Sequence, residues 1–499
     1  MHQSPTDRPR PRVLHITQPV DGGVARVLAD LTRAQLAAGL DVVVACPESA
    51  TAAALRSLGA DVRPWGAVRA PGPATVTEVR RLSAVIGAVR PDLVHAHSAK
   101  AGLAGRLAVR GRIPTVFQPH AWSFEAVRGV AAGLALGWER RGARWAARVV
   151  CVSEGERLRG ALAGVRARWA VIPNGVDPDR FSPGPAAPAV RPPLPAGDGE
   201  ADGPLVVCVG RLCRQKGQDV LLAAWPRVAE KVPGARLVLV GDGPDRERLA
   251  AAAPASVRFA GAVEDPVPWY RAAGLVVLPS RWEGMALAPL EAMACGRPVV
   301  VTDVDGAREC LPPALVPHCL IPPGDPAALA DAVSALLLDA PLGASLGRRG
   351  RAHVLAAHDV RRTAAAVTEL YRTLLTGGAE PRSRAAARTP LDAGPAPRRP
   401  AHHAPPGTGP AAAGAPERPP AGDASVTGTP PPGTPGTPAV PAPGPAVGTP
   451  PRTPADDRPI TRTPPPTPVG HAPVAGGAGA SSGFTEDGRH SERRESVHS

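Results

Sequence analysis

Short apolar runs that alternate with amphipathic segments are the feature that most constrains the fold. In the first half of the chain they include "RVLHIT", "DVVVAC" and "RVVCVS", and in the second half "LVVCVG", "RLVLVG" and "PVVVT". Between the first two runs, Val27, Leu28 and Leu31 fall on one helical face. Strand and helix therefore alternate, which predicts an α/β fold with parallel sheets.

Two stretches rich in Pro, Gly and Ala interrupt this alternation. Such text cannot bury a core, so we expect an interdomain linker and a disordered, low-complexity tail. The second domain should restart the pattern of the first, and its last helices should pack back on the first domain. The predicted parts are a flexible N-terminus at 1–11, a Rossmann-like, doubly wound domain at 12–181, the linker at 182–204, a second such domain at 205–376 and the tail at 377–499.

The charge of the chain comes almost wholly from arginine. The formal net charge is +13, yet Lys100, Lys216 and Lys231 are the only lysines. We find no basic run interleaved with aromatic residues and no DNA-binding motif, which argues against a nucleic-acid partner. A basic surface also suits phosphate-rich ligands or an anionic membrane face, although a solvated arginine surface is the more ordinary explanation.

Cysteine spacing and hydropathy bear on the cellular setting. The seven cysteines form no CxxC pair, which argues against a disulfide framework or a zinc site. The opening "MHQSPTDRPRPR" lacks the apolar stretch of a signal peptide. No run approaches the roughly 20 apolar residues of a membrane span. We therefore expect a cytoplasmic enzyme.

Two acids eight positions apart, Glu283 and Glu291, stand in the otherwise small and apolar stretch "RWEGMALAPLEAMACGRPVV". The pattern predicts a strand that ends just before this stretch, then a turn, then a helix that Gly296 and Pro298 stop. Glu283 should lie in the loop at the carboxyl end of the strand, and Glu291 should lie inside the helix. Both side chains can then face one ligand-binding cleft.

The start of that predicted helix is a candidate anion site. The backbone N–H groups of Gly284, Met285 and Ala286 should be unpaired there, and the helix dipole favours negative charge. Gly284 has no Cβ, so a phosphate can approach the backbone closely. A glutamate at a helix start is also often no more than a favourable partner of the dipole.

A second loop, "VGRLCRQKGQ", follows the first strand of the second domain and carries positive charge. Gly210 and Arg211 lie in its turn, and Lys216 lies near its end. An arginine offers a planar fork to phosphate oxygens and a lysine a point charge, so together they can hold a diphosphate. On its own, such a basic pair is usually a solvated surface.

A third loop, "LVGDGPDRERL", contributes Gly241, Asp242 and Gly243 after another strand. It lacks the third glycine of the G-x-G-x-x-G dinucleotide fingerprint, and neither domain's first turn shows that fingerprint with a following acid. This argues against a dinucleotide dehydrogenase. The loop is interpreted as a tight turn that lines the cleft, and packing alone explains it equally well.

Taken together, "GRLCRQKG", "GDGP" and "PSRWEGMALAPLEAMACGRPVV" resemble the donor half of the GT4-type retaining glycosyltransferases, which have the GT-B fold and an E-x7-E signature. The resemblance covers residues 12–375 and implies that the two domains face each other across a cleft, with the nucleotide sugar bound by the second. It implies that Arg211 and Lys216 hold the nucleotide diphosphate. It also implies that the loop from Glu283 to Leu287 holds the donor sugar and phosphate, and that Glu291 binds the ribose.

The first domain agrees with this resemblance and would be the acceptor domain. "DGGVARV" is similar to the family's glycine loop, in which Gly22 and Gly23 let the backbone approach sugar and acceptor. In "TVFQPHAWSFE", His120 stands at the position that the family places against the donor sugar near the reacting carbon. Trp122 and Phe124 are candidate walls of an acceptor pocket, and core packing is at least as plausible for both.

The chain also contains residues that could hold a metal. His95 and His97 alternate on a predicted strand and could join His120, although a His-x-His pair more often packs at a domain edge. Asp-x-Asp pairs occur at 177–179, in a turn, and at 303–305, in a helix-entry loop. Because the basic loop and the helix start can stabilise a leaving diphosphate, we expect that no metal or other cofactor is required.

The resemblance predicts a retaining hexosyltransferase that moves a sugar from a UDP- or GDP-linked donor to an acceptor hydroxyl, in cell-surface polysaccharide or glycolipid assembly. The expected acceptor is a sugar or lipid-linked saccharide at the inner face of the plasma membrane, with peripheral membrane association; a soluble acceptor such as an inositol phosphate stays open. Two other classes also stay open. One is a nucleotide-sugar epimerase of the same fold, which needs no acceptor, and the other is a non-catalytic nucleotide-sugar-binding or scaffold protein.

Overall fold

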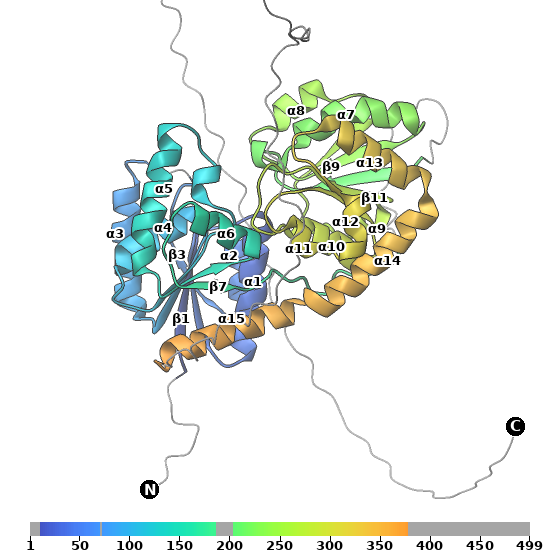
Figure 1. Cartoon of the computed structure of the whole chain (residues 1–499). Coiled ribbons are helices and arrows are strands. Elements are labelled where there is room, and N and C mark those ends of the chain that lie inside the picture. Colours follow the sequence, from blue (N-terminus) through green and yellow to red (C-terminus); the bar gives the residue numbers. More distant parts are fainter. Residues whose placement is uncertain (1–9, 70–71, 186–202, 378–499) are drawn as a thin grey trace, which may run out of the picture. The chain divides into compact units, whose positions relative to one another are not determined.

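Two β-sheets, one in each half of the chain, organise the residues that the computed structural model describes, which are 10–69, 72–185 and 203–377. Every pairing between the named strands is parallel. Helices flank both sheets (Figure 1). The predicted α/β class with two doubly wound halves is confirmed. Most of the predicted linker, nearly all of the predicted tail and most of the predicted flexible N-terminus lie outside the described residues.

The sheet of the first half has the strand order β3-β2-β1-β4-β5-β6-β7. Its direction of growth reverses between β1 and β4, where His15 of β1 lies in register with His95 of β4. The strands are β1 (Arg12–Thr17), β2 (Asp41–Cys46), β3 (Asp61–Pro64), β4 (Leu93–His97), β5 (Thr115–Gln118), β6 (Arg148–Cys151) and β7 (Trp169–Val171). The helices are α1 (Gly22–Ala37), α2 (Ala50–Ser57), α3 (Thr75–Val89), α4 (Ser98–Val109), α5 (Val130–Gly142) and α6 (Glu154–Leu162).

The sheet of the second half has the order β10-β9-β8-β11-β12-β13 and reverses between β8 and β11. Its strands are β8 (Leu205–Val209), β9 (Arg236–Val240), β10 (Val257–Gly261), β11 (Leu275–Leu278), β12 (Val299–Thr302) and β13 (Leu320–Ile321). The helices of this half are α7 (Gln218–Lys231), α8 (Arg246–Ala252), α9 (Val267–Ala272), α10 (Leu287–Ala294), α11 (Ala307–Cys310), α12 (Val316–Cys319), α13 (Pro326–Leu338), α14 (Ala340–Ala357) and α15 (Val360–Leu375).

Local sequence explains why these elements form where they do. The inner strands are mostly apolar and buried, as in "DVVVAC", because helices cover both faces of a parallel sheet. On α1, Leu28 and Leu31 are buried, as the periodicity predicts. Asp325 caps α13 by accepting hydrogen bonds from the N–H groups of Ala327 and Ala328. The short strands β3, β7 and β13 lack a long apolar run, which is why the sequence pattern did not predict them.

The last helix crosses back to the first half of the chain. The backbone of Val176 bonds with the residues that open α15, and α15 then packs against α1. Tyr371 of α15 places its hydroxyl against Nδ1 of His95. Among the described residues no single helix is long and apolar enough to cross a membrane; α13 and α14 pass that test only as a pair, bent by 101°.

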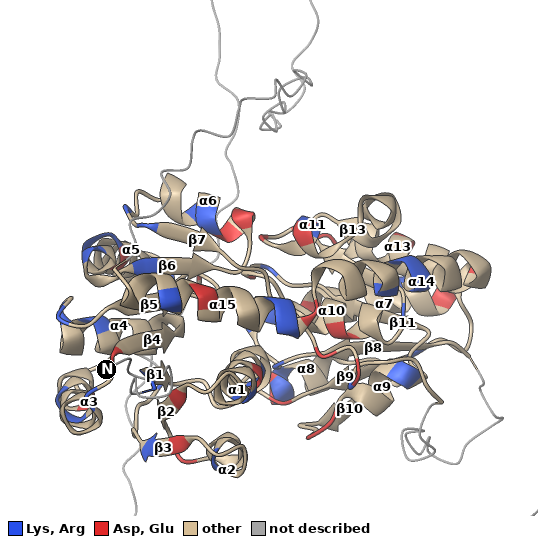
Figure 2. Ribbon diagram, turned by 90° about the horizontal axis from the view of Figure 1, so that it is seen from below, with Lys and Arg blue, Asp and Glu red and all other residues tan. Residues whose placement is uncertain are grey.

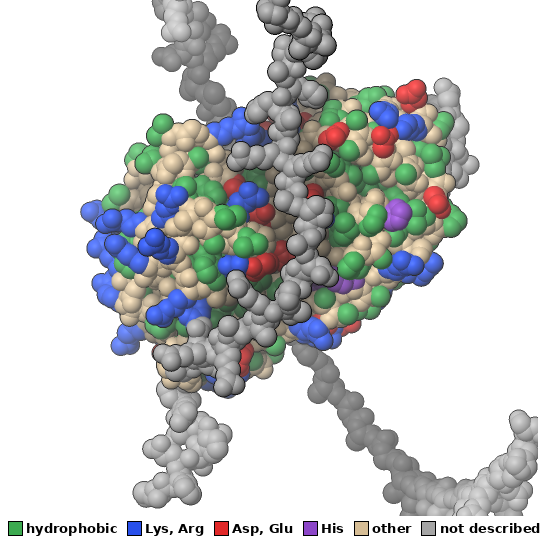
Figure 3. All heavy atoms as spheres, viewed as in Figure 1, with side chains coloured by type: hydrophobic (Ala, Val, Ile, Leu, Met, Phe, Trp, Pro, Cys, Tyr) green, Lys and Arg blue, Asp and Glu red, His purple; other side chains and the backbone are tan. Residues whose placement is uncertain are grey.

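Basic side chains gather on the first half of the chain. Figure 2 shows Lys and Arg on α3, α4 and α5, and Figure 3 shows many such side chains over the visible face of the same domain. Arg80, Arg81, Arg90 and Arg110 are among the exposed ones. Much of the positive charge is therefore a solvated arginine surface on one domain.

Candidate active site

The loops after β8 and β11 meet at the centre of the second sheet, where its strand order reverses. Nζ of Lys216 lies 2.5 Å from Oε1 of Glu283, and the hydroxyl of Ser280 donates to the same oxygen at 2.7 Å. The side chains of Glu283 and Lys216 are 8% and 20% exposed. The structure thus brings together two of the predicted catalytic residues, a buried carboxylate and a partly exposed ammonium group.

Arg211 lies in the same loop as Lys216. Its backbone carbonyl accepts a hydrogen bond from Nε2 of Gln218 at 3.0 Å, which ties the loop to the start of α7. Its guanidinium has no ion pair or side-chain hydrogen bond within the described part of the chain. A partly exposed cation in the same loop as Lys216 is therefore available for an anionic ligand.

The glycines of the β9 loop serve the packing of two loops. A Cβ built on Gly241, whose φ is +136°, would lie 2.2 Å from the carbonyl oxygen of Gly210. One built on Gly243 would lie 2.3 Å from a carbonyl oxygen of the same β8 loop. Asp242 is exposed and pairs with Arg246. The packing interpretation therefore accounts for Gly241 and Gly243, two of the three predicted donor-binding residues of this loop.

The loop that leads into α10 is held by residues of the first half. The carbonyl oxygen of Gly284 accepts a hydrogen bond from the hydroxyl of Ser153 at 2.7 Å. That of Met285 accepts one from Nδ2 of Asn174 at 2.8 Å. A Cβ on Gly284 would lie 2.9 Å from Oε1 of Glu156, so the absence of a side chain is required for this close approach.

The predicted helix start is confirmed in position. α10 begins at Leu287, and Ala286 is its N-cap without a side-chain hydrogen bond to the first turn. A Cβ on Gly23, in the first turn of α1, would lie 3.7 Å from Cδ1 of Leu287. Gly22 opens the same turn with a φ of +66° and open space where a Cβ would stand. The glycine loop of the first half thus lies beside the start of α10.

Glu291 lies in α10 as predicted and is held by two protein groups. Nη1 of Arg26, from α1, bonds Oε1, and the hydroxyl of Tyr270 donates to Oε2 at 2.6 Å. Burial lowers the pKa of Arg26, but the charge of Glu291 together with Tyr270, the hydrogen bond to Glu291 and the charge of Asp30 outweighs burial, so that pKa is raised. The resemblance assigns Glu291 to the ribose, and in this structure both of its carboxylate oxygens already accept hydrogen bonds from protein groups.

His120 lies in a strained turn after β5. His120 and Ala121 have φ values of +58° and +121°, which residues with a Cβ seldom adopt. The N–H of Ala121 donates to Oε1 of Glu156 at 2.7 Å, and the N–H of Val152 donates to Oε2 at 2.8 Å. Burial lowers the pKa of His120 to about 3, so its ring is neutral near pH 7. Glu156 therefore fixes the turn that carries the predicted catalytic histidine.

The structure contains a cluster of three histidines, but His15 takes the place that the sequence analysis gave to His120. The ring nitrogens that lie within 4.8 Å of one another belong to His15, His95 and His97, all fully buried, whereas His120 contacts only His97 among them, at 3.2 Å. Such a trio has the atoms for a metal site. Hydrogen bonds already occupy its ring nitrogens, except Nε2 of His95, which has no partner in the described residues.

The aspartate pairs and the aromatic candidates have local structural partners. Asp177 accepts hydrogen bonds from two backbone N–H groups of its own turn. Asp305 forms a two-bonded pair with Arg159 of α6, at 2.8 Å for each bond. Trp122 is 1% exposed, stacks on Phe124 and belongs to the core beneath the turn. Trp122 is therefore a core residue in this structure.

Sequence reasoning missed the residues that hold the loops. Arg26, Ser153, Glu156, Asn174 and Tyr270 were not singled out, yet each contacts a predicted site residue or its turn. One signal was available: Ser153 and Glu156 have the S-x-x-E spacing of a capping box at the start of α6, and the hydroxyl of Ser153 caps the helix by accepting from the N–H of Glu156 at 3.0 Å. That signal predicts a helix start, and it does not predict the contacts with the β11 loop.

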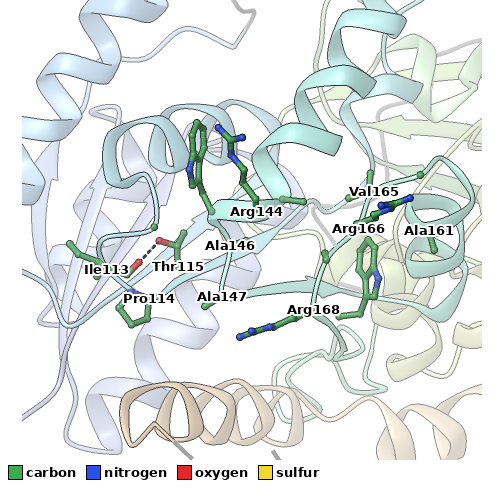
Figure 4. A pocket seen from close by; sticks show the side chains of 16 residues that line it. Ile113, Pro114, Thr115, Arg144, Ala146, Ala147, Ala161, Val165, Arg166 and Arg168 are labelled. Atoms are coloured by element: carbon green, nitrogen blue, oxygen red, sulfur yellow. Dashed lines mark hydrogen bonds between the residues drawn. The ribbon is translucent and has the colours of Figure 1, made fainter. Parts of the chain in front are cut away.

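One hollow of the first half lies away from this site. It has a volume of about 970 Å³ and surrounds the amino ends of β5, β6 and β7, with Arg144, Arg166 and Arg168 at its rim (Figure 4). The residues described above follow the carboxyl ends of strands. The hollow and the candidate site therefore lie at opposite ends of the first sheet.

Comparison with known proteins identifies the family. The family described as Glycosyl transferases group 1 matches residues 203–339, and Glycosyltransferase Family 4 matches residues 21–180. A D-inositol 3-phosphate glycosyltransferase from Xylanimonas cellulosilytica is 35% identical over 283 residues, which cover 52% of this chain and 67% of the relative.

A second relative is the GDP-mannose-dependent alpha-(1-6)-phosphatidylinositol monomannoside mannosyltransferase of Mycobacterium tuberculosis, 37% identical over 227 residues. The match covers 42% of this chain, and the chain spans 57% of that relative's length.

Solved structures share the fold. Sucrose-phosphate synthase from Thermosynechococcus elongatus has a TM-score of 0.63 at 24% identity, covering 74% of this chain and all of the other. Anabaena Alr3699/HepE, solved in complex with UDP-glucose, has a TM-score of 0.61 at 23% identity, covering 72% and 99%. Both likenesses confirm the predicted GT-B architecture. The two matched families, with the relative of which this chain covers 67%, show that the chain belongs to glycosyltransferase family 4.

Proposed function

We propose that the chain catalyses an anomer-retaining transfer of a hexose from a nucleotide diphosphate sugar to an acceptor hydroxyl. The observation that carries the proposal is the Lys216–Glu283 pair at the carboxyl ends of the two central strands of the second sheet. The loop of Lys216 also carries Arg211, whose guanidinium has no partner among the described residues. Two cations near the uncapped start of α10 suit a diphosphate, and a carboxylate beside them suits sugar hydroxyls.

The proposed reaction breaks one bond of the donor sugar and forms one bond to the acceptor, and charge develops on both the sugar and the diphosphate. The bond between the anomeric carbon and the diphosphate oxygen breaks, the bond to the acceptor oxygen forms on the same face, and the acceptor's proton passes to the departing phosphate. Positive charge grows on the sugar and negative charge on the diphosphate. Arg211, Lys216 and the N–H groups at the start of α10 stabilise the diphosphate charge, so we propose that no metal or cofactor is required.

The relatives suggest which substrates to test first. One is named as GDP-mannose-dependent and as acting on a phosphatidylinositol monomannoside, and another as acting on D-inositol 3-phosphate. We infer a GDP- or UDP-linked hexose as donor and an acceptor that contains inositol or a lipid-linked saccharide. A lipid-linked acceptor would bring the chain to the inner face of the membrane. The soluble inositol phosphate is the second candidate acceptor, because the relative so named matches over 283 residues.

The test is nucleotide release by the purified full chain. GDP-mannose and a set of UDP-sugars are supplied with D-inositol 3-phosphate, with phosphatidylinositol vesicles, or with neither, and each is repeated with EDTA. We expect release of one nucleotide that depends on an acceptor and survives EDTA, with a product that keeps the donor's anomeric configuration by NMR. Sugar isomerisation without acceptor would identify an epimerase, and binding without turnover a non-catalytic protein.

A further inference from the structure

A continuous row of hydrogen bonds runs from His120 into the core of the first domain. Nε2 of His120 lies 3.2 Å from Nδ1 of His97, and Nε2 of His97 lies 3.0 Å from Nδ1 of His15. Nε2 of His15 lies 2.7 Å from Oε1 of Gln35, on α1. We call His120, His97, His15 and Gln35 the imidazole row. It connects the predicted catalytic histidine to a buried side chain of α1.

The three rings of the row are neutral. His15 and His97 are fully buried, and burial lowers the pKa of His15 to about 4 and that of His97 well below its ordinary value. A neutral imidazole carries one N–H donor and one bare acceptor nitrogen. Each hydrogen bond in the row therefore needs the hydrogen from one ring and the lone pair of the next group.

The amide at the inner end sets the direction of the whole row. A carbonyl oxygen only accepts, so His15 donates to Gln35 from Nε2 and presents a bare Nδ1 to His97. His97 then donates from Nε2 and presents a bare Nδ1 to His120. His120 must donate from Nε2. Three hydrogens serve three bonds, and Nδ1 of His120 is left without one.

Tyr371 of α15 favours this orientation of the Gln35 amide. Burial raises the pKa of the Tyr371 phenol, and a side-chain interaction with Gln35 lowers it in part, as an N–H that faces the phenol oxygen would. Nε2 of Gln35 has no hydrogen-bond partner among the described residues, whereas Oε1 faces His15 at 2.7 Å.

We propose that His97 and His15 are positioning residues that hold His120 in the tautomer with hydrogen on Nε2, so that His120 meets its ligand as a hydrogen-bond acceptor through Nδ1. Only the identity of this ligand, a hydroxyl of the nucleotide sugar, rests on the proposed function. The strained turn that Glu156 fixes and the row that holds Nε2 restrain the ring at two ends. Neither restraint depends on bound substrate.

The direct test is the tautomer itself. The full chain with 15N-labelled histidine is studied by long-range proton–nitrogen correlation NMR near pH 7.5, and the His120 signals are assigned from their loss in His120→Asn. We expect a protonated Nε2 and a bare Nδ1 in the absence of any substrate. A protonated Nδ1 on His120 would overturn the proposal, and this readout does not depend on whether the chain transfers sugar.

Variants of His97 separate positioning from packing. His97→Leu removes the acceptor for His120, and we expect mixed tautomers and a loss of kcat of about tenfold, the net worth of one hydrogen bond. His97→Asn offers an amide oxygen near the place of Nδ1 and should restore the single tautomer. Equal loss in both variants would contradict the positioning role. The matched control is His95→Asn, equally buried on β4 but bonded to Tyr371, which should leave the His120 tautomer unchanged.

A second experiment tests whether the histidine nitrogens bind a metal ion instead of forming the imidazole row. The purified chain is incubated with Zn²⁺, dialysed and analysed for metal content. We expect no retained zinc that depends on His15, because the row already uses the nitrogens of His15 and His97. One equivalent of zinc that is lost in His15→Asn would overturn the row. If the His97 variants do not fold, the wild-type spectrum still decides the tautomer.

Discussion

The two sheets present different chemistry at the carboxyl ends of their central strands. In the second half, buried Glu283 pairs with the partly exposed Lys216, and the loop of Lys216 also carries Arg211, whose guanidinium has no partner among the described residues. In the first half, His15 and His97 are neutral and fully buried. The charged residues of the second half suit the binding and release of an anion. The neutral histidines of the first half suit a role in orienting the ring of His120. One half can stabilise charge and the other can fix geometry.

The largest expected effect tests the charged half. Lys216→Ala removes one of the cations proposed to stabilise the leaving diphosphate, and kcat should fall by about 10²- to 10³-fold, as on removal of one preorganised donor. The control is Lys231→Ala, an exposed lysine that pairs with Asp331 at 2.6 Å and should leave kcat unchanged. Near-normal turnover of Lys216→Ala in the nucleotide-release assay would remove the charged half from the mechanism.

The next effect tests the ion pair that joins the halves. Arg26→Ala leaves Glu291 buried without its cation, so the free energy of unfolding should fall by about 3 kcal/mol. Arg33→Ala, on the same helix, breaks an exposed pair with Asp30 and should cost no more than about 1 kcal/mol. Urea unfolding of both variants measures the difference. Equal, small losses would show that the Glu291 contact is a surface pair in solution.

A smaller effect tests how closely the first half approaches the β11 loop. Gly284→Ala introduces a Cβ 2.8 Å from Cγ2 of Val152, and the overpacking should cost about 1–3 kcal/mol of stability and lower kcat. Gly87→Ala, in α3 with open space around it, should be neutral or stabilise by up to about 1 kcal/mol. Thermal unfolding and the transfer assay report both quantities. A neutral Gly284→Ala would mean that the two segments lie farther apart.

The smallest effect concerns pH. Burial raises the pKa of Glu156 from 4.5 to about 8, so the folded state keeps a proton that the unfolded chain releases. Between these values stability should fall as pH rises, by at most about 1.4 kcal/mol per pH unit. Glu156→Gln should flatten this part of the profile because glutamine does not titrate. The glutamine amide has one accepting oxygen, so it keeps only one of the two backbone hydrogen bonds that Glu156 accepts.

Urea unfolding between pH 5 and 8 checks this prediction. Glu154→Gln, which removes a half-exposed partner of Arg157, is the matched control and should keep the wild-type slope. The same slope in Glu156→Gln and wild type would show that Glu156 is ionised in the folded state.

Much of the fold could be predicted because its signal is local. Apolar runs give β1, β2 and β10 with the observed ends, since both faces of each sheet are covered. Apolar periodicity and an N-cap give α13. The two-residue β13 has no such run, and its place depends on its neighbour β12.

The charged part of the site could be predicted for a similar reason. Lys216 and Glu283 each follow a recognisable strand, and the carboxyl ends of adjacent parallel strands meet. The imidazole row could not be predicted, because Gln35 and His15 become neighbours only through α1 and β1. The contact of Arg26 with Glu291 spans 265 positions and depends on how the two halves pack. Gly241 and Gly243 show that a glycine pattern alone does not separate ligand binding from loop packing.

The return of α15 has a consequence for engineered hybrids. The helix is the last described element of the chain, yet Tyr371 contributes a hydroxyl to His95 and the helix packs on α1. A chimera that exchanges the carboxyl-terminal half between relatives would replace that hydroxyl and that packing face together. The natural crossover points are therefore two, one before β8 and one before Val360, so that α15 is inherited with the half it contacts.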